Sequence, residues 1–181
     1  MDEPTDIGLI AACQQGDATA LRQVFERYQD QVYRLCRHMA GNAQDAEDLT
    51  QECFVQAFGH LHSFRGDSAF GTWLFRIAAN CCLGARRKRR ATFVPLDPEL
   101  PQPGGSGPED QLMRQELVGR VETAIAALPE NQRLLLVLGT QLEMSYQQIG
   151  QIAGCSEDAV KMRLHRARKQ MREALKTYLE T

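Results

Sequence analysis

The stretch of residues 64–90 combines side chains suited to contacting nucleic acid. Asp67 or Ser68 can cap a helix that starts at Ala69. Five consecutive basic residues, 86–90, end this helix; they cannot be buried and they suit phosphate groups. An apolar face would be formed by Phe70, Trp73, Leu74, Ile77 and Cys81, and a polar face by Thr72, Arg76, Asn80 and Arg87. The pattern fits a nucleic-acid-reading helix, and equally a core helix that runs into a solvated charge run.

A second candidate site for nucleic acid lies near the C-terminus. Ser145 and Gln148 fit a capping box that opens a short helix, and Gly154 permits a tight turn after it. Ser156 can cap the next helix, which has one apolar stripe in an otherwise basic sequence. This order predicts a helix-turn-helix whose second helix enters a major groove. The groove side is assigned to Lys161, Met162, His165 and Arg166, and the phosphate contacts to Arg168 and Lys169. The alternative is a helical hairpin with a solvated basic face.

A third candidate surface is acidic. Asp45, Asp48 and Glu52 fall on one side of a predicted helix that Asp45 would cap, and Gln51 and Gln56 join them. Like charges at this spacing repel slightly and do not stabilise the helix. Taken alone, a solvated face explains them most simply, and docking onto a basic partner helix is the functional alternative.

Helical periodicity runs through the rest of the chain, and no strand pattern appears. Residues 1–93 are expected to form a compact domain of four helices. Residues 94–111 hold five of the seven prolines, three glycines and four acids, which is typical of a flexible linker. Residues 112–181 form a second helical domain that contains the helix-turn-helix. The predicted fold class is therefore all-α, with two small domains joined by a Pro/Gly-rich linker.

The net charge of −2 hides a segregation of charge along the 181 residues. Residues 64–93 carry seven bases and one acid, between an acidic first segment and an acidic linker. This alternation suggests DNA on one surface and a basic partner on another. No apolar run is long enough to span a membrane and the acidic N-terminus lacks a signal pattern, so a cytoplasmic location is expected.

Cysteine and histidine spacings match no metal motif, so neither a metal nor another cofactor is expected. The six cysteines are interpreted mainly as small buried hydrophobes, with a redox or metal role for Cys81, Cys82 or Cys155 as the alternative. No nucleophile motif, phosphate loop or carboxylate cluster at metal spacing is present, so an enzyme acting on nucleic acid is disfavoured.

Both halves together resemble the extracytoplasmic-function (group IV) sigma factors of bacterial RNA polymerase. The segments DAEDLTQECFVQAF and FRGDSAFGTWLFRIAAN are similar to the family's second conserved region. The segment LPENQRLLLVLGTQLEMSYQQIGQIAGCSEDAVKMRLHRARKQMR resembles its fourth, and the proline-rich segment matches its linker. The resemblance implies a non-enzymatic subunit that binds core RNA polymerase and directs promoter recognition, strand opening and transcription initiation at stress-response genes. It also implies control by an anti-sigma factor, often anchored in the membrane.

The resemblance assigns residues to three surfaces. The first would grip the coiled coil of the polymerase's largest subunit: Asp45, Asp48, Leu49, Gln51, Glu52 and Gln56. The second would capture a flipped base and read the minus-ten element: Phe64, Arg65, Asp67, Ser68, Trp73, Arg76, Asn80, Arg86 and Arg87. The third would read the minus-thirty-five duplex: Ser156, Lys161, Met162, His165, Arg166 and Arg168.

The chain departs from the family pattern in three respects. Gly84 replaces a frequent acid four residues after Asn80, so the helix is expected to bend or end early there. Cys81 and Cys82 are unusual beside Asn80, and Met162 stands where a hydroxyl is frequent.

Two further alternatives are an ordinary helix-turn-helix regulator and a regulatory protein that binds another sigma factor. The first leaves the acidic helix unexplained, and the basic recognition helix speaks against the second.

Overall fold

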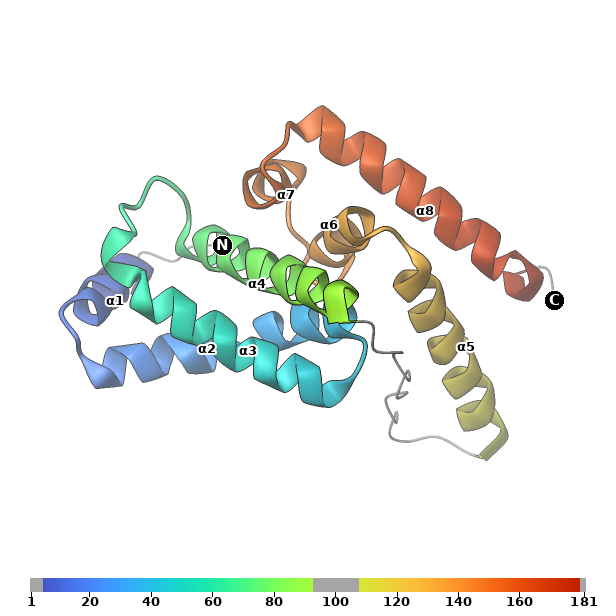
Figure 1. Ribbon diagram of the computed structural model, residues 1–181, viewed down its shortest axis with the longest axis horizontal. Helices are drawn as coiled ribbons and strands as arrows, with labels where there is room; N and C mark the ends of the chain where they lie inside the picture. The colour runs from blue at the N-terminus through green and yellow to red at the C-terminus, as the bar shows by residue number, and fades with distance from the viewer. Residues whose placement is uncertain (1–4, 93–107, 180–181) are drawn as a thin grey trace.

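The computed structural model describes residues 5–92 and 108–179, and within these ranges the chain is all-α, as predicted (Figure 1). The first domain contains α1 (Thr5–Gln14), α2 (Ala18–Ala40), α3 (Ala43–Gly59), the short 3₁₀ turn η1 (Leu61–Ser63) and α4 (Phe70–Thr92). The second contains α5 (Pro108–Ala127), α6 (Glu130–Thr140), α7 (Tyr146–Ala153) and α8 (Glu157–Leu179). No helix in the described part of the chain is long and apolar enough to cross a membrane.

Side-chain caps fix the ends of the helices in the first domain. The Asp17 carboxylate accepts hydrogen bonds from the backbone N–H groups of Thr19 and Ala20 at the start of α2. The predicted cap of α3 was wrong: Asn42, and not Asp45, accepts the N–H of Asp45 at 2.8 Å. Gly41 ends α2 in the left-handed region, and the next residue, Asn42, is already the N-cap of α3. The acidic helix therefore begins one turn earlier than expected.

The core of the first domain lies where α2, α3 and α4 pack together. The buried surface of α4 is broader than the predicted stripe, because it also includes Phe75, Ala78 and Cys82. Thr72, assigned to the polar face, is only 3% exposed, so that assignment is corrected. The physical reason is that α4 contacts α2, α3 and α7, and so it is covered on more than one side. Gly84 does not end the helix, which continues to Thr92.

The second domain is organised by the predicted capping box. Ser145 and Gln148 exchange side-chain to backbone hydrogen bonds of 2.9 and 3.2 Å at the start of α7. Gly154 ends α7 with a left-handed φ of 64° and leads into α8. A Cβ at Gly150 would stand 2.6 Å from the Cys155 carbonyl oxygen, so this close turn requires glycine. The helix-turn-helix is thus formed by α7 and α8, with Val160, Leu164 and Ala167 buried as predicted.

The first turn of α5 falls within the segment predicted as linker, since α5 begins at Pro108. Residues 108–111 are therefore helical, and the rest of that segment, 94–107, lies outside the described residues.

The two domains pack against each other. Helix α4 contacts α7, and α2 contacts both α5 and α6. At this boundary Arg76 Nε donates a hydrogen bond to the Gln151 carbonyl oxygen, at 3.1 Å. The first helix of the helix-turn-helix therefore lies against the helix assigned to the minus-ten element (Figure 1).

Candidate nucleic-acid and protein interfaces

An aromatic cluster supports the loop before α4. The ring centroids of Phe64, Phe70 and Trp73 lie 5.4 to 5.6 Å from one another. Phe70 is buried, whereas Phe64 and Trp73 are half-buried and keep part of their rings at the surface. Such partly exposed rings can stack on an unpaired base, and each stacked base contributes about 1–3 kcal/mol.

The loop itself is held at its base by α1. Gln14 Nε2 donates to the carbonyl oxygens of Leu61 and Phe64, at 3.1 and 3.0 Å. Beyond this anchor, Arg65 and Asp67 are exposed and Ser68 is half-buried, with its hydroxyl directed to the Ala69 carbonyl. The loop thus has a fixed base and a polar tip. Sequence inspection did not single out Gln14, because its partners are distant backbone carbonyls.

Polar side chains continue from this loop along the outer side of α4. Arg76, Asn80 and Arg87 are exposed, at intervals of about one or two turns. The side chain of Arg86 lies outside the described residues. The arrangement combines aromatic rings, an amide and cations on one face, which suits an unstacked base and its phosphates. Arg76 of this set also contacts the second domain, through its hydrogen bond to the Gln151 carbonyl oxygen.

Helix α3 carries the acidic surface. Asp48, Gln51, Glu52 and Gln56 are exposed, and Gln56 Nε2 donates to Glu52 Oε1 at 3.0 Å. The remaining two predicted residues differ. Asp45 is half-buried and bonded to the Asn42 side chain, and Leu49 is only 6% exposed in the domain core. Leu49 therefore positions the helix from inside.

Val55 was missed by sequence reasoning, although it lies on the same side of α3 as the acidic surface. It is 72% exposed and follows Gln51 and Glu52 by four and three residues. The signal was present in the sequence, because Val55 does not fit the buried stripe that includes Cys53 and Ala57. An exposed β-branched residue among carboxylates makes this surface suited to a partner that is both basic and apolar.

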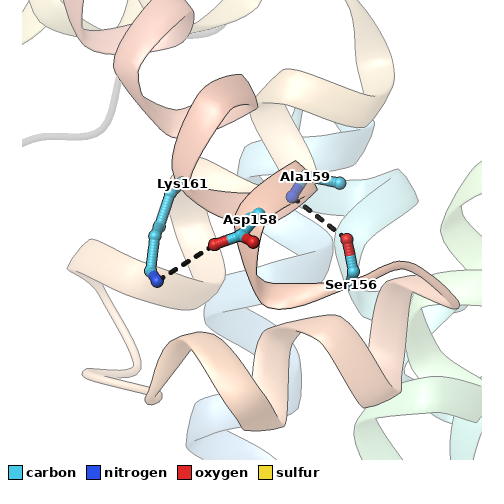
Figure 2. Close-up of polar contacts among 4 residues, drawn as sticks. All are labelled: Ser156, Asp158, Ala159 and Lys161. Carbon is cyan, nitrogen blue, oxygen red and sulfur yellow. Dashed lines mark hydrogen bonds and ion pairs between the residues drawn. The ribbon is translucent and has the colours of Figure 1, made fainter.

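The start of α8 presents the third set of residues (Figure 2). The Ser156 hydroxyl accepts the N–H of Ala159 at 3.3 Å, so it caps the helix. Lys161 Nζ lies 3.2 Å from Asp158 Oδ1, in a pair whose members are both exposed. Exposed pairs of this kind contribute about 0–1 kcal/mol, so the ammonium is readily available to another acceptor. Further exposed members of the predicted set are Met162, His165, Arg166 and Arg168.

Comparison with family models places both surfaces of the first domain in one known region. Residues 24–92 match the model "Sigma-70 region 2", which includes α3 and α4, and residues 119–171 match "Sigma-70, region 4", which includes α7 and α8 up to Met171.

Characterised relatives cover nearly the whole chain. It is 33% identical to "ECF RNA polymerase sigma factor SigW" of Bacillus subtilis, over 92% of this chain and 95% of that protein. It is 34% identical to "ECF RNA polymerase sigma-E factor" of Escherichia coli K12, over 93% of each.

Solved structures match the two-domain arrangement as well. CnrH, in complex with the cytosolic domain of CnrY, has a TM-score of 0.72 and 25% identity, covering 93% of this chain and 96% of that one. The sigma factor RpoE of Bartonella quintana, in complex with the anti-sigma factor NepR, has a TM-score of 0.70 and 25% identity, covering 86% and 96%.

Proposed function

The chain belongs to the extracytoplasmic-function family of RNA polymerase sigma factors, and on that premise we propose how its three surfaces divide the work of starting transcription. The first domain would bind core polymerase and open the minus-ten element, and the second would hold the minus-thirty-five duplex. The observation that carries this proposal is the coexistence, on one small domain, of an exposed acidic surface on α3 and an exposed aromatic and cationic face on α4.

Polymerase binding is assigned to the exposed side of α3. Asp48 and Glu52 supply charge for a basic partner helix, and Val55, about one turn after Glu52, supplies an apolar contact. In sigma factors of this family, the resemblance points to the coiled coil of the polymerase's largest subunit as that partner. Charge complementarity would fix the orientation of the domain on the polymerase.

We expect Asp48→Arg to weaken the binding of core polymerase at least about tenfold, because it places a cation against a basic surface. Asp30→Arg makes the same charge change at an exposed site on α2 and serves as the matched control. Fluorescence anisotropy of labelled protein titrated with core enzyme measures both. Equal affinity for the two variants would contradict the assignment of α3.

Promoter opening is assigned to the loop of residues 64–68 and the outer side of α4. A base that leaves the stack costs a few kcal/mol, and a pocket with phosphate contacts must offset this cost. Phe64 and Trp73 offer rings for stacking, Asn80 offers a hydrogen-bonding amide, and Arg76 and Arg87 offer charge for the backbone.

Duplex binding at the minus-thirty-five element is assigned to the exposed residues at the start of α8. Lys161, His165 and Arg166 are exposed and can donate hydrogen bonds to base edges, and Arg168 can hold the phosphates. Met162, which is 57% exposed, suits an apolar feature of the groove such as a thymine methyl group.

An anti-sigma factor is the proposed regulator. CnrH and RpoE, to which the chain is similar, were each solved with a partner, CnrY or the anti-sigma factor NepR. We propose a comparable inhibitor here, anchored in the membrane, with the sigma factor itself acting in the cytoplasm. Release of the inhibitor on stress would then free the three surfaces.

Run-off transcription tests the function as a whole. Purified protein mixed with core polymerase and a library of genomic fragments should yield RNA with defined starts that core enzyme alone does not produce. Mapping the starts would also identify the promoter sequence. Absence of both polymerase binding and defined starts would overturn the proposal.

A further inference from the structure

Four of the six cysteines lie together in the core of the first domain, although no sequence motif joins them. Cys36 is on α2, Cys53 on α3, and Cys81 and Cys82 on α4, three helices that pack against one another (Figure 1). Cys36, Cys53 and Cys82 are fully buried, and Cys81 is 7% exposed at the edge. We call these four residues the thiol cluster.

Cys36 is the centre of the thiol cluster. Its Sγ lies 3.8 Å from Cys82 Sγ and 4.0 Å from Cys53 Sγ. A disulfide needs the sulfurs at about 2.05 Å, so side-chain rotation with a small approach of the helices would bring either pair into bonding distance. Within the described ranges, no three Cys, His, Asp or Glu side chains are placed to hold a metal ion. The chemistry available to the cluster is therefore thiol chemistry.

We propose that Cys36, paired with Cys53 or Cys82, is a site of reversible oxidation by a hydroperoxide. The proposal goes beyond the function proposed above and does not depend on it. The three cysteines come from three different helices, so a disulfide at this site would covalently join α2 to α3 or to α4.

Hydrogen bonding within the cluster selects Cys36 as the nucleophile. Its sulfur is within hydrogen-bonding distance of both the Cys53 and the Cys82 sulfur, and these hydrogen bonds lower the pKa of Cys36 despite burial. The hydrogen bond with Cys36, together with burial, instead raises the pKa of Cys82. Because the thiolate is the reactive form, the central sulfur should react first once peroxide reaches it.

The reaction balances with the hydroperoxide as the oxidant. The Cys36 thiolate attacks one peroxide oxygen, the O–O bond breaks, and the other oxygen takes a proton and leaves as an alcohol, or as water where the oxidant is hydrogen peroxide; Cys36 becomes a sulfenic acid. The thiol of Cys53 or Cys82 then attacks this sulfur, the S–O bond breaks, and water leaves with the thiol proton. Two thiols are oxidised and one peroxide is reduced. The remaining thiol lies close enough to exchange with the new disulfide.

Peptide mapping of the whole, folded chain tests the proposal. The protein is treated with hydrogen peroxide, unfolded with an alkylating agent present, and digested with trypsin without reduction. Cys36 leaves in the peptide 35–37, Cys53 in 38–65, and Cys82 in 77–86. We expect peptide 35–37 to be cross-linked to 38–65 or 77–86, and to be released by a thiol reductant. The Cys81→Ala variant assigns any link in 77–86 to Cys82.

Two variants provide the controls. Cys36→Ala should lose the cross-link, whereas Cys13→Ala should keep it, since Cys13 is also buried but lies on α1 outside the cluster. Full alkylation of all six cysteines after peroxide, or a disulfide that leaves Cys36 free, would overturn the proposal. The map of the unmodified chain decides this even where a variant fails to fold.

Discussion

At the scale of single residues, the exposed side chains of α4 and α8 have distinct expected effects. Asn80 is exposed on α4 and is assigned to an opened strand, while Lys161 is exposed on α8 and is assigned to intact duplex. Substitutions at the two residues should therefore affect different steps: strand opening for Asn80 and duplex binding for Lys161.

We expect Asn80→Ala and Trp73→Ala to reduce strand opening about tenfold or more, because each removes one contact to an unstacked base. Core binding should stay normal, since neither residue lies on α3. Permanganate reactivity of unpaired thymines in the polymerase complex measures the opening. Reactivity equal to that of the unsubstituted protein would reject these roles.

Lys161→Ala should weaken binding of a minus-thirty-five duplex by about 1–3 kcal/mol if the ammonium reaches a base edge. The lost pair with Asp158 is exposed and should cost the fold little. Arg22→Ala, which breaks a similar exposed pair with Glu26 on α2, is the matched control. Mobility-shift titration of the full chain should show a loss of affinity for the first variant only.

At the scale of elements, two glycines that both lie inside helices have opposite structural demands. Gly84 lies inside α4 with no atom within 4 Å of an added Cβ, whereas a Cβ at Gly150 would meet the backbone of Cys155 at 2.6 Å. Gly84→Ala should therefore stabilise the protein by about 0.5–1 kcal/mol through helix propensity. Gly150→Ala should destabilise it. Urea unfolding followed by circular dichroism gives both changes, and a loss of stability in Gly84→Ala would contradict the first.

Local signals predicted most of the elements. The capping box of Ser145 and Gln148, the turn at Gly154 and the apolar stripe of α8 act within a few residues, so the sequence suffices for them. The wrong cap of α3 was a local error, but other errors arose where tertiary packing decides. Thr72 is buried because three helices cover α4, and the grouping of Cys36 with residues on α3 and α4 depends on packing alone.

The candidate surfaces were predicted to a similar extent. Exposed polar residues on α3, α4 and α8 lie where helical spacing put them, and their binding roles stay predictions. Val55 was missed because the α3 surface was predicted from its charged side chains alone. The contact of Arg76 with Gln151 was missed because it joins residues of different domains. No local pattern encodes such a contact.

At the scale of the whole molecule, the packed arrangement of the domains covers part of the surface that we assign to the minus-ten element. Arg76 donates to the Gln151 carbonyl, and α7 lies against α4. The domains would therefore have to part before Arg76 could contact a promoter. At a separate contact between the domains, that of α2 with α6, His38 on α2 is partly buried and is influenced by the charge of Arg133 on α6.

The packing of the two domains near His38 should depend on pH. Burial and the cations of Arg37 and Arg133 lower the pKa of His38 below its usual value of 6.5. The packed state therefore favours neutral His38, and its stabilisation is present above pH 6.5 and is lost as the pH falls below it. Small-angle scattering should show the radius of gyration rising on acidification. His38→Gln should lessen that rise; an unchanged response in this variant would contradict the assignment.

The tight turn between α7 and α8 has a consequence for how the DNA sequence preference of such proteins can change. Since Gly150 admits nothing larger than hydrogen beside the Cys155 carbonyl, the tilt of α8 relative to α7 is set by main-chain contact. Residues at the start of α8, such as Met162, can then be exchanged without altering that tilt. New promoter preferences could thus arise by exchange of side chains on a helix of unchanged orientation. A substitution at Gly150 would instead change the orientation of α8 and so move all of these side chains together.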